Sequence, residues 1–171
     1  MQQKKGQKGF SLIELLIVVA IIGIIAAIAI PNLLASRRAA NEASAISTIR
    51  TVNSAEATYS STVGNGSYGD LGELVGQSLV DEKVGNMDTD VKSGYFMNVA
   101  PSDGDGDGAD EAYVVGAAPN TASTGARIFS SDESGIIYSA AATTYGVANI
   151  CIAHRPSDLP HRRRSADRLW H

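Results

Sequence analysis

The segment that most constrains this chain is a near-continuous apolar run from Phe10 to Ile30, interrupted only by Ser11, Glu14 and Gly23. As a helix, its 21 residues span roughly 31 Å, which matches a bilayer hydrocarbon core of about 30 Å. A helix is expected because a lone strand would leave backbone donors and acceptors unpaired in lipid. A plain anchor gains nothing from a carboxylate, so Glu14 indicates a further role for this segment.

Positive charge in the leader indicates how the segment is oriented. Lys4, Lys5 and Lys8 precede the run, and the next basic residue is Arg37, which predicts a cytoplasmic N-terminus with the rest of the chain outside. Two other interpretations stay open. One is an ordinary secretory signal cleaved near Ala27-Ile28-Ala29, for which the run is long and carries a charge. The other is a single-pass anchor in which Glu14 reaches the headgroup layer.

The stretch from Lys8 to Leu16, with Gly9-Phe10 and Glu14 ahead of an apolar helix, resembles the N-terminus of type IV pilins and type II secretion pseudopilins. The resemblance extends from residue 4 to about residue 40. It implies that a membrane aspartyl enzyme, prepilin peptidase, cuts after Gly9 and methylates the new amino terminus at Phe10. It also implies three kinds of partner: further copies of the chain, this peptidase, and an inner-membrane assembly platform with its ATPase motor.

The chemistry of the motif fits these roles. Glycine at position 9 lets a membrane peptidase approach the backbone without a side chain in the way. Burying Glu14 in an apolar bundle is costly unless it is paired, and the free amino group of Phe10 on a neighbouring subunit is the natural partner. Glu14 and Phe10 are therefore the candidate assembly residues, because a charge satisfied only by a neighbour acts as an assembly switch.

Beyond the apolar run, residues 32–62 are expected to continue the helix in amphipathic form. Their apolar stripe is formed by Ile46, Ile49, Val52 and Tyr59. Pro31 is expected to break the helix, either by kinking it or by beginning a new one, and Gly23 is a second weak point. The stretch Gly64-Asn65-Gly66 predicts its end.

Residues 63–152 are expected to form one globular head, which gives an α+β fold with the long helix packed on a small antiparallel sheet. A short helical turn within residues 67–82 would supply the anchors Leu71, Leu74, Val75 and Leu79. Four strand-like pieces follow, at residues 93–99, 111–117, 126–130 and 135–139. The stretch 125–138 also resembles the C-terminal hairpin of many pilins, with residues 131–134 as its link.

An acidic loop contains the only candidate metal ligands. Its carboxylates are spaced like the start of an EF-hand calcium loop, with Gly108 at the turn position: Asp103, Asp105, Asp107, Asp110 and Glu111. Val114 stands where the bidentate glutamate would be. The loop is therefore either a weak or structural calcium site or a solvated acidic turn between two strands. No other cofactor is expected.

Composition excludes several functions. Between the leader (residues 1–9) and the last 18 residues the chain has 6 basic and 16 acidic residues, which argues against a nucleic-acid-binding head. All three histidines lie in those last 18 residues, and no nucleophile with a nearby base is recognisable, so an enzyme is not expected. Cys151 is the only cysteine, which rules out the internal disulfide loop that many pilins contain. The basic tail 153–171 is either a binding patch or a disordered terminus.

The sequence therefore predicts a structural subunit of a type IV pilus-like filament, held in the bacterial inner membrane and then assembled outside it or in the periplasm. The nearest alternative is a pseudopilin of a type II secretion system, which shares the N-terminal pattern. A membrane-anchored monomeric binding domain remains a third interpretation, in which Glu14 is incidental.

Overall fold

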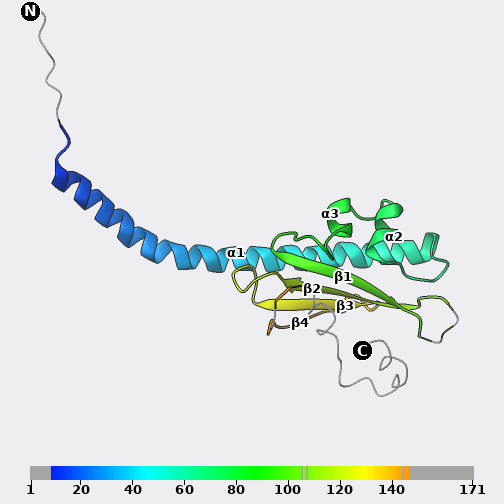
Figure 1. Cartoon of the computed structure of the whole chain (residues 1–171). Coiled ribbons are helices and arrows are strands. Elements are labelled where there is room, and N and C mark those ends of the chain that lie inside the picture. The colour runs from blue at the N-terminus through cyan, green and yellow to red at the C-terminus, as the bar shows by residue number, and fades with distance from the viewer. Residues whose placement is uncertain (1–8, 105, 107, 144, 147–171) are drawn as a thin grey trace, which may run out of the picture. The chain divides into compact units, whose positions relative to one another are not determined.

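The computed structural model describes residues 9–104, 106, 108–143, 145 and 146. The elements, shown in Figure 1, are α1 (Leu12–Thr62), α2 (Leu71–Gly76), α3 (Glu82–Gly85), β1 (Tyr95–Ser102), β2 (Ala112–Pro119), β3 (Arg127–Asp132) and β4 (Ile137–Ala141). The chain divides into two compact units, Met1–Arg37 and Arg38–His171. Four subjects of the sequence predictions lie outside the described residues: leader positions 1–8, Asp105 with Asp107, Cys151, and the tail from residue 153.

Helix α1 is continuous from Leu12 to Thr62 and contains both Gly23 and Pro31, so neither residue ends the helix and no new helix begins at Pro31. The reason is that a proline removes only one backbone donor, and the turns on either side already hold the helix together. The side-chain amide of Asn32, next to the proline, donates to the carbonyl of Ile28 at 3.2 Å and adds a bond where the ladder is interrupted. A single interior glycine costs about 1 kcal/mol, too little to stop so long a helix.

The end of α1 lies where the sequence predicts it. The N–H groups of Val63 and Gly64 both donate to the carbonyl of Tyr59, at 3.0 and 2.9 Å. Asn65 and Gly66 then adopt positive φ angles of 53° and 101°, which close the helix end in the left-handed conformation.

Two short helices follow the long one. Asp70 and Glu73 form a capping box at the start of α2, which fixes where this helix begins. Leu71 and Leu74 are buried, as predicted for the helical turn in this region. Helix α3 was not expected from the sequence; the side chain of Asp81 caps it by accepting from the N–H of Val84 at 2.8 Å.

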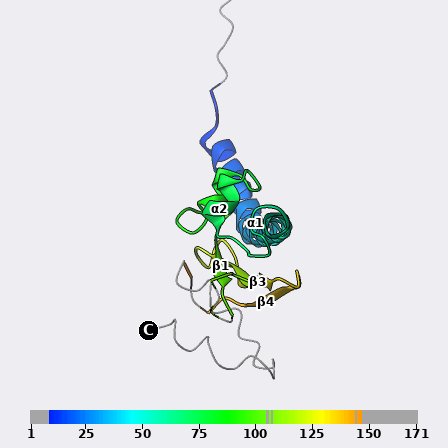
Figure 2. The same cartoon turned by 90° about the vertical axis from the view of Figure 1, so that its right-hand side faces the viewer.

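The head contains a four-stranded sheet with the order β1-β2-β3-β4, and every neighbouring pair is antiparallel. The predicted α+β fold is thus confirmed. The unit that begins at Arg38 places the last part of α1 along one face of this sheet, with α2 beside the helix (Figures 1 and 2).

Each strand begins and ends later along the chain than the sequence suggested. The piece predicted to start at Ser93 starts at Tyr95, because Ser93 and Gly94 have φ angles of 51° and 77° and form a turn. Strand β1 continues beyond its predicted end through Pro101, which an edge strand tolerates because the missing donor is not needed by a second neighbour. The link between β3 and β4 shifts likewise, to residues 133–136, and Gly135 in this turn has a φ of 71°.

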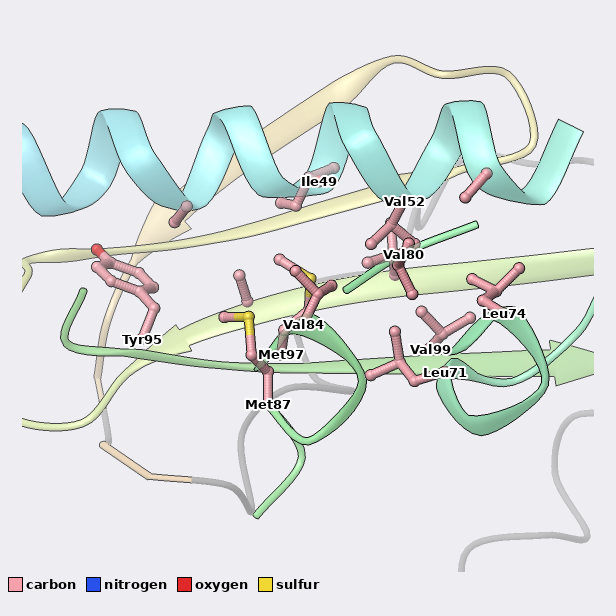
Figure 3. Close-up of a cluster of buried hydrophobic side chains, with 14 of the residues drawn as sticks. Ile49, Val52, Leu71, Leu74, Val80, Val84, Met87, Tyr95, Met97 and Val99 are labelled. Atoms are coloured by element: carbon pink, nitrogen blue, oxygen red, sulfur yellow. The ribbon is translucent and has the colours of Figure 1, made fainter. Parts of the chain in front are cut away.

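The core lies between α1, the facing side of the sheet, and the short helices (Figure 3). Of the predicted stripe on α1, Ile49 and Val52 are fully buried, whereas Ile46 and Tyr59 are partly buried at its margin. From the rest of the head, the same buried cluster includes Leu74, Met87, Tyr95, Met97, Val99, Val115 and Phe129. Alternate residues of β1 point into this core, as expected for a strand with one buried face.

Candidate assembly segment and the contacts that hold the head

The predicted cleavage site lies immediately before α1. Gly9 and Phe10 are both exposed, and Phe10 has 82% of its surface accessible. A Cβ added to Gly9 would meet no atom within 4 Å, so the described part of the chain leaves the peptide bond after Gly9 open to approach. This geometry is compatible with proteolysis at this bond.

Glu14 lies in the first turn of α1. A carboxylate there is favourably placed, because the N-terminal end of a helix carries partial positive charge. Among the described residues the one ion pair is formed by Glu42 and Arg127, so Glu14 has no cationic partner in that part of the chain. Its neighbours on the helix are apolar and exposed.

The first unit exposes apolar side chains on all sides of the helix. The large ones are Phe10, Leu12, Ile13, Leu15, Leu16, Ile17, Val18, Val19, Ile21, Ile22, Ile24, Ile25, Ile28, Ile30, Leu33 and Leu34. By length and composition this stretch of α1 is able to cross a membrane, and none of it is buried. An apolar surface of this extent is stable only in lipid or against another apolar partner.

The acidic loop between β1 and β2 is only partly described. The carboxylate of Asp103 accepts from the N–H groups of Gly106 and Gly108, at 2.6 and 2.9 Å. The Glu111 carboxylate accepts from the N–H of Gly104 at 3.2 Å, and the carbonyl of Asp110 accepts from the N–H of Tyr68. Within the described part of the chain no three His, Cys, Asp or Glu side chains gather as a metal site. Calcium binding therefore stays a prediction.

The structure reveals polar contacts within the head that the sequence did not predict. The first of them joins α1 to β3. Glu42, a buried carboxylate, accepts from both Nε and Nη2 of Arg127, at 3.0 and 2.7 Å. It also accepts from the N–H of Ala126 at 3.1 Å. The Arg127 guanidinium lies 5.4 Å from the ring centre of Phe129, which adds a cation–π contact.

A second polar contact joins the C-terminal part of the same helix to two strands. The side-chain amide of Asn53 donates to Oγ of Ser131 at 2.9 Å, and its oxygen accepts from the hydroxyl of Tyr113 at 3.1 Å. Nearer the start of the head, the amide of Asn41 donates to the carbonyl of Thr124 at 2.9 Å. These bonds fix the rotation of α1 over the sheet, because each requires a particular side of the helix.

Glu56 is the third unpredicted residue, and it is fully buried. Its Oε2 accepts from the N–H of Gly69 at 3.1 Å, while Oε1 has no hydrogen-bond partner. The pKa of Glu56 is raised to about 7, mainly by burial; the hydrogen bond from Gly69 opposes this rise, and the nearby carboxylates of Glu73 and Asp70 add to it. The spacing could have indicated that Glu42 and Glu56 are buried, because they lie seven residues before and after Ile49 and so share its face of α1.

An open groove of 590 Å³ lies between α1 and the segment that carries α2 and α3. Its polar lining includes Lys92, Asp81 and Glu82, and Asp81 is already engaged in capping α3. These groups do not form a nucleophile with a base, so the groove suggests no catalytic chemistry.

Comparison with known proteins identifies the N-terminal segment. Residues 4–30 match the family model described as the prokaryotic N-terminal methylation motif. The chain is 63% identical to the type IV wide pilus major component of Thermus thermophilus over 38 residues, which is 22% of this chain and 29% of that protein.

Other relatives share similarly short segments. Identity to the type II secretion system core protein G of Aeromonas hydrophila is 38% over 47 residues, covering 28% of this chain and 33% of that protein. Identity to a fimbrial protein of Pseudomonas aeruginosa is 79% over 28 residues, covering 16% and 18%. The chain thus spans no more than about a third of the length of these curated relatives. No solved structure matches the chain.

Proposed function

We propose that the chain is a member of the type IV pilin and type II secretion pseudopilin family and that it is a structural subunit of a type IV pilus-like filament. The methylation motif and the short matches to these proteins support this proposal. In this role the protein performs no catalysis. Its chemistry lies in insertion, trimming and self-association, which are carried by Gly9, Phe10, Glu14 and the apolar part of α1.

Before assembly, the apolar part of α1 spans the inner membrane. The basic leader holds the N-terminus in the cytoplasm, and the head lies on the other side. Prepilin peptidase cuts after Gly9 and methylates the amino group of Phe10. Removal of the leader takes away the charges that would otherwise oppose withdrawal of the helix from the bilayer.

During assembly, the platform and its ATPase motor move subunits from the membrane into the filament. The apolar helices then cover one another, and the Glu14 carboxylate of one subunit pairs with the Phe10 amino group of a neighbour. This pairing makes addition selective, because an incoming subunit out of register would leave a charge unpaired in an apolar core.

One observation carries the proposal. The methylation motif at residues 4–30 overlaps the start of a helix whose surface there is exposed and apolar on all sides, with Glu14 as its one charged residue. An ordinary signal sequence explains neither the carboxylate nor the helix that continues to Thr62. A simple anchor explains neither the motif nor Glu14.

Processing is tested by replacing Gly9 with leucine. We expect Gly9→Leu to accumulate at full length in the membrane, because the side chain obstructs the peptidase at the scissile bond. The unaltered chain should yield a protein that begins at methylated Phe10, as read by mass spectrometry of the N-terminal peptide.

The matched control for this test is Gly6→Leu, which alters a glycine of the same leader away from the scissile bond and should leave cleavage normal. A mature protein that begins at Ile30 would contradict the proposal and identify the segment as a secretory signal. Normal maturation of Gly9→Leu would contradict the assigned cleavage site.

A pseudopilin of a type II secretion system is the second candidate, and similarity to core protein G supports it. The two roles share the N-terminal chemistry and differ in the surrounding machinery. Neighbouring genes for a retraction motor would favour the pilus, whereas genes for an outer-membrane secretion channel would favour the pseudopilus. A membrane-anchored monomeric binding domain would instead be indicated by a processed protein that forms no filament when its assembly machinery is present.

A further inference from the structure

The contact between Glu56 and Gly69 lies where α1 ends and the chain turns back. Gly69 immediately precedes Asp70, the capping residue of α2, so its N–H ties the start of that helix to α1. The segment between the helices, residues 63–70, is tightly folded over the Tyr59 ring. A Cβ added to Gly69 would lie 3.1 Å from that ring and 2.9 Å from the Glu73 carboxylate.

The groups that face Glu56 are acidic or phenolic. They are Tyr59 on α1, Asp70 in the following segment, Glu73 on α2, and Tyr113 on β2. Among these described neighbours none is basic, so an ionised Glu56 would meet like charge and no counter-ion. One of its oxygens would also remain without a hydrogen bond in a site closed to water.

We propose that Glu56 is a pH-sensitive latch of the head: in its neutral form it holds residues 63–70 and the start of α2 against α1, and ionisation loosens this contact. Neither the proposed filament role nor the N-terminal motif is needed for this inference. It concerns how the head responds to the acidity of the medium.

The direction of the pH effect follows from proton binding. Because the pKa of Glu56 is about 7 in the folded head, against 4.5 for an exposed glutamate, the folded state holds the proton to higher pH. The stabilisation that Glu56 gives to the folded state is therefore complete below about pH 4.5. It falls as the pH rises from there to about 7, and it does not change further at higher pH. Between pH 5.5 and 8 the ratio of the closed latch to the open latch should fall by roughly 30-fold.

The test uses the full chain in detergent micelles. We expect the protection of the Gly69 amide against hydrogen exchange, corrected for the intrinsic rate, to fall by roughly 30-fold from pH 5.5 to pH 8. In Glu56→Gln, which keeps the shape and the acceptor without a charge, protection should stay nearly constant. Glu133→Gln, an exposed carboxylate in the turn after β3, is the matched control and should behave as the unaltered chain.

A second measurement is independent of whether the variant folds. The carboxyl carbon of Glu56, followed by NMR in the unaltered chain, should titrate with a midpoint near 7. A midpoint below 5, or Gly69 protection that does not change between pH 5.5 and 8 in the unaltered chain, would overturn the latch. Equal pH dependence in the unaltered chain and in Glu56→Gln would overturn the assignment to this residue.

Discussion

Three side chains of α1, Glu42, Asn53 and Glu56, each bind a different part of the head. Glu42 has the strongest set of partners, because its carboxylate accepts from a forked guanidinium and from a backbone N–H. The Arg127 side chain is 52% exposed, whereas that of Glu42 is 11% exposed. Breaking the pair would therefore cost mainly by leaving the Glu42 carboxylate buried without a partner. The pair thus fixes α1 on β3 more than it raises net stability.

Replacing Arg127 with alanine tests this contact. Arg127→Ala should lower the free energy of unfolding of the head by roughly 1.5–3 kcal/mol, because a largely buried carboxylate loses its charged partner. Denaturant melts of the full chain in detergent would measure the change. Arg50→Ala, which removes an exposed arginine of α1, should change stability by less than about 0.5 kcal/mol. Equal losses in the two variants would contradict a role for the pair.

At the scale of the elements, the loop between β1 and β2 decides whether the head binds calcium. Residues 103–111 carry the right spacing at the start, but the Asp103 carboxylate is already bonded to two backbone N–H groups. These bonds would hold the loop closed without an ion. The loop thus resembles a turn that is stabilised by its own aspartate.

We therefore expect identical thermal melts of the full chain in millimolar calcium and in chelator. A calcium site on the folded head would instead stabilise it by about 2.7 kcal/mol at a hundredfold excess over the dissociation constant. A clear rise of the melting temperature with calcium would contradict the solvated turn. If that rise were absent from Asp103→Asn, the carboxylate at the first position would be assigned as a ligand.

Much of the element order was predictable from sequence, and the exceptions have physical causes. Ile49 and Val52 were predicted as core because apolar residues on one helix face need cover. Glu42 and Glu56 were not, because a charged side chain normally faces solvent and only the folded partner reveals why it is buried. The helix passes Pro31 because local propensity is weak against the cooperativity of a long helix.

At the scale of the whole molecule, the N-terminal motif was predictable because it depends on residue type and spacing alone. Gly9, Phe10 and Glu14 can be recognised from the sequence without knowing the fold. What the motif assembles into depends on neighbouring subunits. Glu14 is therefore the residue whose effect is expected only in the filament.

Replacing Glu14 with alanine should separate insertion from assembly. Insertion and Gly9 cleavage should be unharmed, because a carboxylate in a spanning helix costs up to roughly 2.5–3.5 kcal/mol and its loss is favourable to insertion. Filament yield should fall, because the Phe10 amino group of an adjoining subunit would lose its counter-charge, at a cost of about 3–5 kcal/mol. Processed subunit should then accumulate in the membrane fraction.

Two comparisons sharpen this test. Ser11→Ala, a polar residue of the same segment that carries no charge, serves as the matched control and should assemble normally. Co-expression with the unaltered chain should partly restore filaments, since the variant still offers its own amino group. Normal filament yield from Glu14→Ala alone would show that the carboxylate is incidental and would overturn its proposed role in assembly.

The strand order of the sheet has a consequence for how the head folds. Because β1, β2, β3 and β4 pair in the order in which they occur, every strand finds its partner across a short turn and no pairing must wait for a distant segment. Such local topologies fold quickly, since little chain entropy is lost before each contact forms. The four strands can therefore pair one after another along the chain, which shortens the time that their unpaired edges are open to aggregation.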